Sequence, residues 1–139
     1  MIKIFSLLVF LLPSFFANSQ TTDPIITNAN DTIYTVVDSL ATFPGGRPAW
    51  IKHVEKNLNP NVGVENGAKT GTYNVAIRFM VMKDGTLKDF QPETKYGHGF
   101  EQEVIRVLKL SPKWIPAKKN GANVNSFIKQ TQTFIISFG

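Results

Sequence analysis

Catalytic or metal chemistry in this chain would have to come from histidine, serine and carboxylate side chains, because the 139 residues include no cysteine. The only histidines are His53 and His98, and they do not form a His-x-x-x-His or similar metal-binding spacing. None of the serines beyond residue 19 lies in a nucleophile motif: Ser39, Ser111, Ser126 and Ser137. We therefore expect a non-enzymatic protein with no catalytic residue, no metal and no cofactor.

The basic charge of the chain does not by itself point to an anionic partner. The net charge is +5, but the lysines and arginines are scattered and only Lys118 and Lys119 are adjacent. The Gly97–Gly99 stretch precedes a predicted helix and could present amides to an anion, but Glu101 and Glu103 would repel that anion. We expect no nucleic-acid partner, and binding of an anionic ligand is only a weak alternative.

The N-terminus has the three-part layout of a secretory signal peptide. A short basic start is followed by an apolar run from Ile4 to Phe16 and by small residues that suit cleavage after Ser19. The apolar run has about 13 residues, whereas a membrane-spanning helix needs about 20. Residues 1–19 are therefore predicted to be removed on export, which places the folded part outside the cytoplasm. Contact with the membrane is expected only if this segment is retained.

The most regular pattern runs from Gly71 to Phe90 and predicts a β-hairpin. Apolar residues alternate with other types up to Val81, which is typical of a strand with one face on a core. Gly85 suits a tight turn. A three-residue turn would place Val81 opposite Leu87, whereas a two-residue turn would place it opposite Lys88, so we expect the longer turn, which pairs apolar with apolar. The next apolar residue after Leu87 is Phe90, three positions on, which indicates a bulge or bend.

Two amphipathic helices and two further β segments are expected around this hairpin. Helical spacing of apolar residues predicts helices at Pro48–Leu58 and Phe100–Leu110, with a loop at Asn59–Lys69. Asn120–Gly121 predicts a tight hairpin turn, and the alternation from Val124 onward predicts a long final strand that is bent or bulged near Gln130. Trp50 and Trp114 are interpreted as core residues.

The N-terminal lead-in and the helices complete the expected α+β fold. Residues 20–42 are predicted to be a flexible lead-in, with a possible short extra strand at Ile33–Val37. The two helices are expected to pack on one face of a small three-stranded antiparallel sheet, because this arrangement buries both apolar stripes.

An ordered set of short motifs resembles a known family. The set comprises Phe43–Gly46 (FPGG), Val75–Val81 with Asp84–Gly85, helix residues Glu103, Val104 and Arg106, Pro112–Ala117 (PKWIPA), Asn120–Gly121 and Phe134. In this order the motifs resemble the C-terminal domain of TonB, in the form common among Bacteroidetes-like bacteria. The resemblance covers residues 43–139.

The resemblance implies a periplasmic binding domain associated with TonB-dependent transmembrane transport. In that family the domain captures a short N-terminal segment of an outer-membrane transporter as an added strand, on the edge of the final strand. The implied partner here is a TonB-dependent transporter or another envelope protein. The alternate residues of the final strand that would face away from the core are Asn125, Phe127, Lys129, Thr131 and Thr133.

The chain departs from full-length TonB, and this keeps a second function open. The family's energy transducers have a long membrane anchor and a proline-rich spacer, whereas the lead-in here is only about twenty residues. We therefore expect the resemblance to bear on the fold more than on energy transduction. The alternative is a structural or assembly domain of the cell envelope that uses the same edge to form a homodimer.

Overall fold

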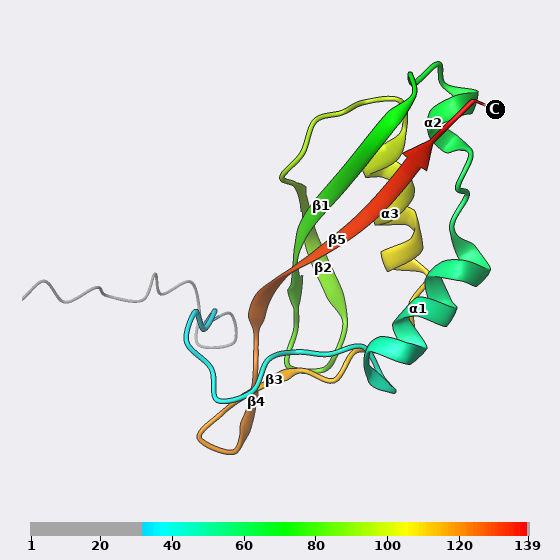
Figure 1. Cartoon of the computed structure of the whole chain (residues 1–139). Coiled ribbons are helices and arrows are strands. Elements are labelled where there is room, and N and C mark those ends of the chain that lie inside the picture. Colours follow the sequence, from blue (N-terminus) through cyan, green and yellow to red (C-terminus); the bar gives the residue numbers. More distant parts are fainter. Residues whose placement is uncertain (1–31, 139) are drawn as a thin grey trace, which may run out of the picture.

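The computed structural model describes residues 32–138 and shows an α+β fold (Figure 1). The elements in chain order are α1 (Gly46–Asn57), α2 (Val62–Glu65), β1 (Gly71–Val81), β2 (Leu87–Pro92), α3 (Phe100–Lys109), β3 (Ala117–Lys119), β4 (Ala122–Val124) and β5 (Ser126–Ile136). One antiparallel sheet has the strand order β2-β1-β5, and β3 and β4 form a second sheet. The predicted signal peptide, residues 1–19, lies outside the described residues. Within residues 32–138, no helix is both long and apolar enough to cross a membrane.

Strand β1 is the centre of the core. Val75, Ile77, Phe79 and Val81 are fully buried on one of its faces. Helix α3 covers that face with its own buried stripe, which consists of Phe100, Val104, Val107 and Leu108. The predicted period-two strand and the predicted second helix are both confirmed.

The β1–β2 hairpin has the predicted register. Val81 pairs with Leu87, and the Met82 N–H donates to the Thr86 carbonyl over 2.8 Å. The predicted bulge is also present, because Arg78 pairs with Gln91 whereas Met80 pairs with Lys88, so that β2 has one residue more than β1 between these pairs.

The chain before α1 is held by hydrogen bonds, and we call residues 32–43 the strap. Ile33 makes an isolated bridge to Asn125, and Ser39 and Thr42 bridge to Lys118 and Ile115. The expected short strand at Ile33–Val37 is therefore absent within the described chain, and residues 32–42 are bonded to the domain although a flexible lead-in was predicted. This docking was not predicted because backbone hydrogen bonds hold these residues, and such bonds require no periodic pattern of side chains.

The final strand differs from the prediction. It pairs with β1 without a register shift from Ser126 to Ile136, so the bulge that was one of the two predictions near Gln130 is absent. The break lies at Asn125, where the chain leaves the β3–β4 hairpin and enters the larger sheet. The Asn120–Gly121 turn of that hairpin is confirmed, with Lys119 paired to Ala122 and both turn residues at positive φ (49° and 77°).

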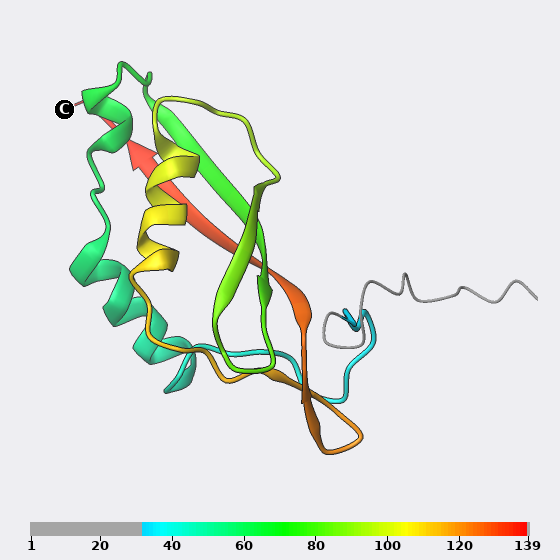
Figure 2. The same ribbon diagram turned by 180° about the vertical axis from the view of Figure 1, so that it is seen from behind.

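Helix α1 lies to one side of the sheet, and α3 covers the face of β1 (Figure 2). The helix begins at Gly46, and its buried residues are Trp50 and Val54. Ile51 is one of the apolar residues whose helical spacing predicted this helix, but its side chain does not join the core and the residue is 44% exposed. The predicted loop at Asn59–Lys69 contains the short helix α2, which seats Gly63 against the Phe100 ring, where a Cβ would lie 2.2 Å from that ring.

Candidate functional site

The outer side of β5 is an open sheet edge. Within residues 32–138, β1 is the only strand of the three-stranded sheet that pairs with β5. The Ala76 carbonyl accepts the Glu93 N–H over 2.9 Å, so the backbone groups of Ala76 point toward β2. Thr131 is the β5 partner of Ala76, and its N–H and C=O therefore point away from β1.

The same alternation applies along the whole strand. Residues with outward N–H and C=O groups are Phe127, Lys129, Thr131, Thr133 and Ile135. One of these carbonyls receives a local hydrogen bond, because the Gln132 side-chain amide donates to the Thr133 carbonyl over 3.1 Å. The edge is thus a row of backbone donors and acceptors of the kind that accepts another strand.

A groove of about 840 Å³ runs beside this edge. One wall is β5 from Phe127 to Thr133, and the other is formed by Leu40 to Phe43 of the strap and by α1. Trp50 and Ile51 are the large apolar residues that α1 contributes. Arg47 and Lys129 are the only charged residues among those that line the groove. The groove therefore combines an open backbone edge, an apolar wall and a cationic rim.

An aromatic cluster holds the helical wall in place. The Trp50 ring lies 5.9 Å from Trp114 and 5.4 Å from Phe43, and the Phe79 ring of β1 lies 5.3 Å from Trp114. Trp50 and Trp114 are 8% and 5% exposed, which confirms that they fill the core. The cluster anchors α1 to the sheet through Trp114, at the base of the groove.

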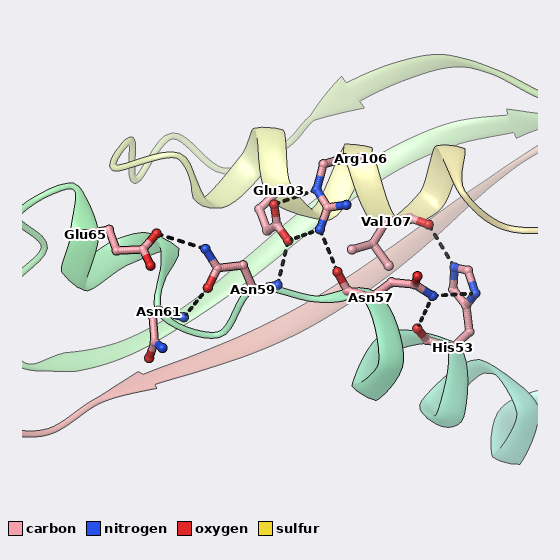
Figure 3. Close-up of polar contacts among 8 residues, drawn as sticks. All are labelled: His53, Asn57, Asn59, Asn61, Glu65, Glu103, Arg106 and Val107. Atoms are coloured by element: carbon pink, nitrogen blue, oxygen red, sulfur yellow. Dashed lines mark hydrogen bonds and ion pairs between the residues drawn. The ribbon is translucent and has the colours of Figure 1, made fainter.

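A polar network fixes the other end of α1 to α3 (Figure 3). The Glu103 carboxylate accepts the Asn59 N–H over 2.7 Å and two hydrogen bonds from Arg106, at 2.9 and 2.6 Å. Arg106 also donates to the Asn57 carbonyl, at the end of α1, over 2.6 Å. The hydrogen bonds from Arg106 hold the pKa of Glu103 below its ordinary value of 4.5, against the opposing effect of burial, and the Asn59 N–H lowers the pKa further.

A histidine adds a second link between the same helices. His53 Nε2 lies 2.9 Å from the Val107 carbonyl, and the Asn57 side-chain amide lies 3.2 Å from His53 Nδ1. These contacts, also drawn in Figure 3, give His53 a structural role between α1 and α3. The helical wall of the groove is therefore set by contacts to α3 and Trp114.

Four of the five predicted edge residues lie on the open edge. Lys129, Thr131 and Thr133 are exposed, and the Arg78 guanidinium stacks 3.8 Å from the centre of the half-buried Phe127 ring. Asn125 was expected to face away from the core but is only 3% exposed. The chain changes from one sheet to the other at Asn125, and this interrupts the alternation of side chains. The Asn125 Oδ1 instead accepts the Lys83 N–H over 2.8 Å.

The Gly97–Gly99 junction is already occupied by a carboxylate of the chain itself. Glu101 accepts the N–H groups of Tyr96 and Gly97, over 2.8 and 3.3 Å, and lies 3.2 Å from the Thr94 hydroxyl, which donates to it. An external anion would therefore meet a buried negative charge here. Within residues 32–138, no three histidine or acidic side chains converge in a group that could hold a metal ion.

The strap and α1 residues of the groove were not among the predicted site residues. Their only sequence signal is the Phe43–Gly46 turn, which is one of the ordered set of motifs described above. Comparisons of the chain with protein-family models, with curated proteins and with solved structures found no match.

Proposed function

We propose that this protein is a non-enzymatic, TonB-like binding domain of the periplasm that captures an extended peptide segment on the open edge of β5. The observation that carries the proposal is the outward row of backbone groups from Phe127 to Ile135 beside an apolar groove. An added strand would pair with that row, and each backbone hydrogen bond would contribute a net 0.5–1.5 kcal/mol, roughly. The TonB-like order of motifs supports the same reading.

The groove specifies what kind of segment fits. Alternate side chains of an added strand would point into the groove toward Trp50 and Ile51, so they should be apolar. The charges nearest to the segment are Arg47 and Lys129, so acidic residues are favoured over basic ones. The proposed partner is the N-terminal segment of an outer-membrane TonB-dependent transporter, or a similar segment of another envelope protein.

A matched pair of variants tests the use of backbone groups. In Thr131→Pro the outward N–H is lost, and the β1–β5 ladder is kept because this N–H does not face β1. In Thr131→Val the N–H remains and only the hydroxyl is lost. The probes are synthetic N-terminal segments of outer-membrane transporters of the same cell, about nine residues long to match the 127–135 edge.

Binding is followed by amide chemical shifts in the nuclear magnetic resonance spectrum. We expect at least one segment to shift the amides of residues 127–135 in the unmodified protein and in Thr131→Val, but not in Thr131→Pro. The proposal fails if no segment in the panel moves these resonances, or if Thr131→Pro binds as tightly as Thr131→Val.

Self-association through the same edge is the second candidate function. An antiparallel pairing of two β5 strands centred on Thr131 would place Lys129 opposite Thr133 of the second copy, so no like charges would face each other. Light scattering across a concentration series separates the two candidates. A mature chain that stays monomeric at every concentration removes the second one.

A further inference from the structure

The strap provides part of the proposed binding site although it belongs to no helix or strand. Leu40, Ala41, Thr42 and Phe43 line the groove opposite β5. Ala41 and Phe43 are buried, whereas Leu40 is 70% exposed toward solvent. Without the strap, part of the wall opposite β5 would be missing.

The second half of the strap is held by backbone pairing. Thr42 and Ile115 exchange two hydrogen bonds, of 2.9 and 2.8 Å, and Ser39 and Lys118 exchange two more, of 3.3 and 3.0 Å. The Asp38 carboxylate accepts the Asn120 N–H over 2.7 Å. The strap thus lies along residues 115–118 as a short antiparallel partner.

The first half of the strap bonds to the residue just before β5 and so limits the open edge at that end. The Tyr34 N–H donates to the Asn125 carbonyl over 2.9 Å. Asn125 has the same parity as Thr131, and its carbonyl is bonded to the strap at the point where β5 begins. The chain itself therefore occupies the start of the edge and leaves residues 127–135 to a partner.

The strap is supported by fewer buried apolar contacts than the strands of the sheet. Ile33, Tyr34, Val36 and Leu40 are exposed. Buried apolar contacts support the strap only at its end, at Ala41 and Phe43, and Val37 is partly buried. Segments of this kind open at a lower free energy than core strands. We propose that docking of the strap and occupation of the β5 edge are coupled, so that each stabilises the other. This inference rests on the proposed function.

Such coupling is reciprocal, so it can be measured through the affinity for the peptide and through the population of the docked strap. If the docked strap raises the affinity for a peptide, the bound peptide must raise the population of the docked strap by the same factor. The Ile115 and Lys118 N–H groups donate to the Thr42 and Ser39 carbonyls of the strap, so their hydrogen exchange reports on its docking.

The test uses Thr42→Pro with Val36→Pro as its matched control. Thr42→Pro removes the N–H that donates to the Ile115 carbonyl. Val36→Pro places proline in the same strap, but at an exposed residue whose backbone makes no hydrogen bond to residues 115–125. The probe is the transporter segment that shifts residues 127–135 most. We expect Thr42→Pro to bind it about tenfold more weakly than Val36→Pro, a difference of about 1.4 kcal/mol. We also expect the probe to slow exchange at Ile115 and Lys118 in the unmodified protein.

The possible results separate this inference from the proposed function. The coupling is overturned, and strand capture is left intact, if the two variants bind the probe with equal affinity. The same holds if the probe shifts residues 127–135 but does not change hydrogen exchange at Ile115 and Lys118. A panel that shifts nothing in the unmodified protein would overturn both. If Thr42→Pro does not fold, Asp38→Ala replaces it with Val36→Ala as control, and weaker binding with faster exchange at Ile115 is again expected.

Discussion

Replacing Glu103 by glutamine tests whether the polar network between α1 and α3 stabilises the fold. The Glu103 side chain is 9% exposed and accepts a backbone N–H from Asn59, a charge-assisted hydrogen bond of about 1.5–3 kcal/mol. Arg106 is 49% exposed, so its pair with Glu103 is screened by water and contributes about 0.2–1 kcal/mol. A neutral amide can still accept one of these bonds. We therefore expect Glu103→Gln to lower the free energy of unfolding by about 2 kcal/mol at pH 7.

The pH dependence of this loss identifies its cause. The pKa of Glu103 in the folded protein lies below its ordinary value of 4.5, chiefly because Arg106 donates to the ionised carboxylate. The stabilisation is therefore complete above pH 4.5 and is lost as the pH falls through the folded pKa. The difference between the unmodified protein and Glu103→Gln should shrink steadily below pH 4.5. Urea unfolding at a series of pH values measures both quantities.

The control is Glu55→Gln, which removes an exposed carboxylate on the outer face of α1. We expect it to change the free energy of unfolding by less than about 0.5 kcal/mol at every pH. If Glu103→Gln behaves like this control at pH 7, the network contributes nothing to stability. If its loss is as large at pH 3 as at pH 7, the loss comes from packing and the reasoning from charge is wrong.

Two further substitutions test the core and the hairpin turn. Phe79→Ala removes a fully buried ring that contacts Trp114 and should lower the free energy of unfolding in urea by about 3–5 kcal/mol. Its control, Ile135→Ala, changes a residue that is 74% exposed and should lower it by less than about 0.5 kcal/mol. Equal losses would contradict the assigned core face. Gly85→Ala places a Cβ 2.3 Å from the Trp114 carbonyl at a φ of +87°, while Gly67→Ala has a φ of +78° and open space around it. Gly67→Ala should therefore cost about 1–2 kcal/mol of backbone strain and Gly85→Ala clearly more, and thermal unfolding that ranks them equally would exclude the steric effect.

Local pattern was sufficient to predict the elements that carry the core. Alternation from Tyr73 to Val81 predicted β1, and the pairing of Val81 with Leu87 was predicted because it sets an apolar residue opposite an apolar residue. The helical stripe beginning at Phe100 and the Asn120–Gly121 turn were predicted for the same reason. In each case the side chains that make the pattern are also those that are buried or that set the turn.

The groove could not be predicted, because it depends on contacts between distant residues. The exposure of Ile51 follows from the position of α1, which is set by contacts to Arg106, Val107 and Trp114, all distant in the sequence. Asn125 has the parity of an exposed residue, but it lies where the chain changes sheets and the parity is interrupted. The strap is held by main-chain groups, which every residue possesses, so its side chains give no signal of the pairing.

The position of β1 between β2 and β5 has a consequence for the order in which the chain can fold. Strand β2 follows β1 after a short turn, so the hairpin can form from a contiguous stretch of chain. The other side of β1 must wait for residues 126–136, which lie at the far end of the described chain. Pairing across such a separation closes a long loop and is slow compared with hairpin formation. Until β5 arrives, β1 is itself an unpaired edge, and a nascent chain exposes to a partner strand the place beside β1 that β5 later fills.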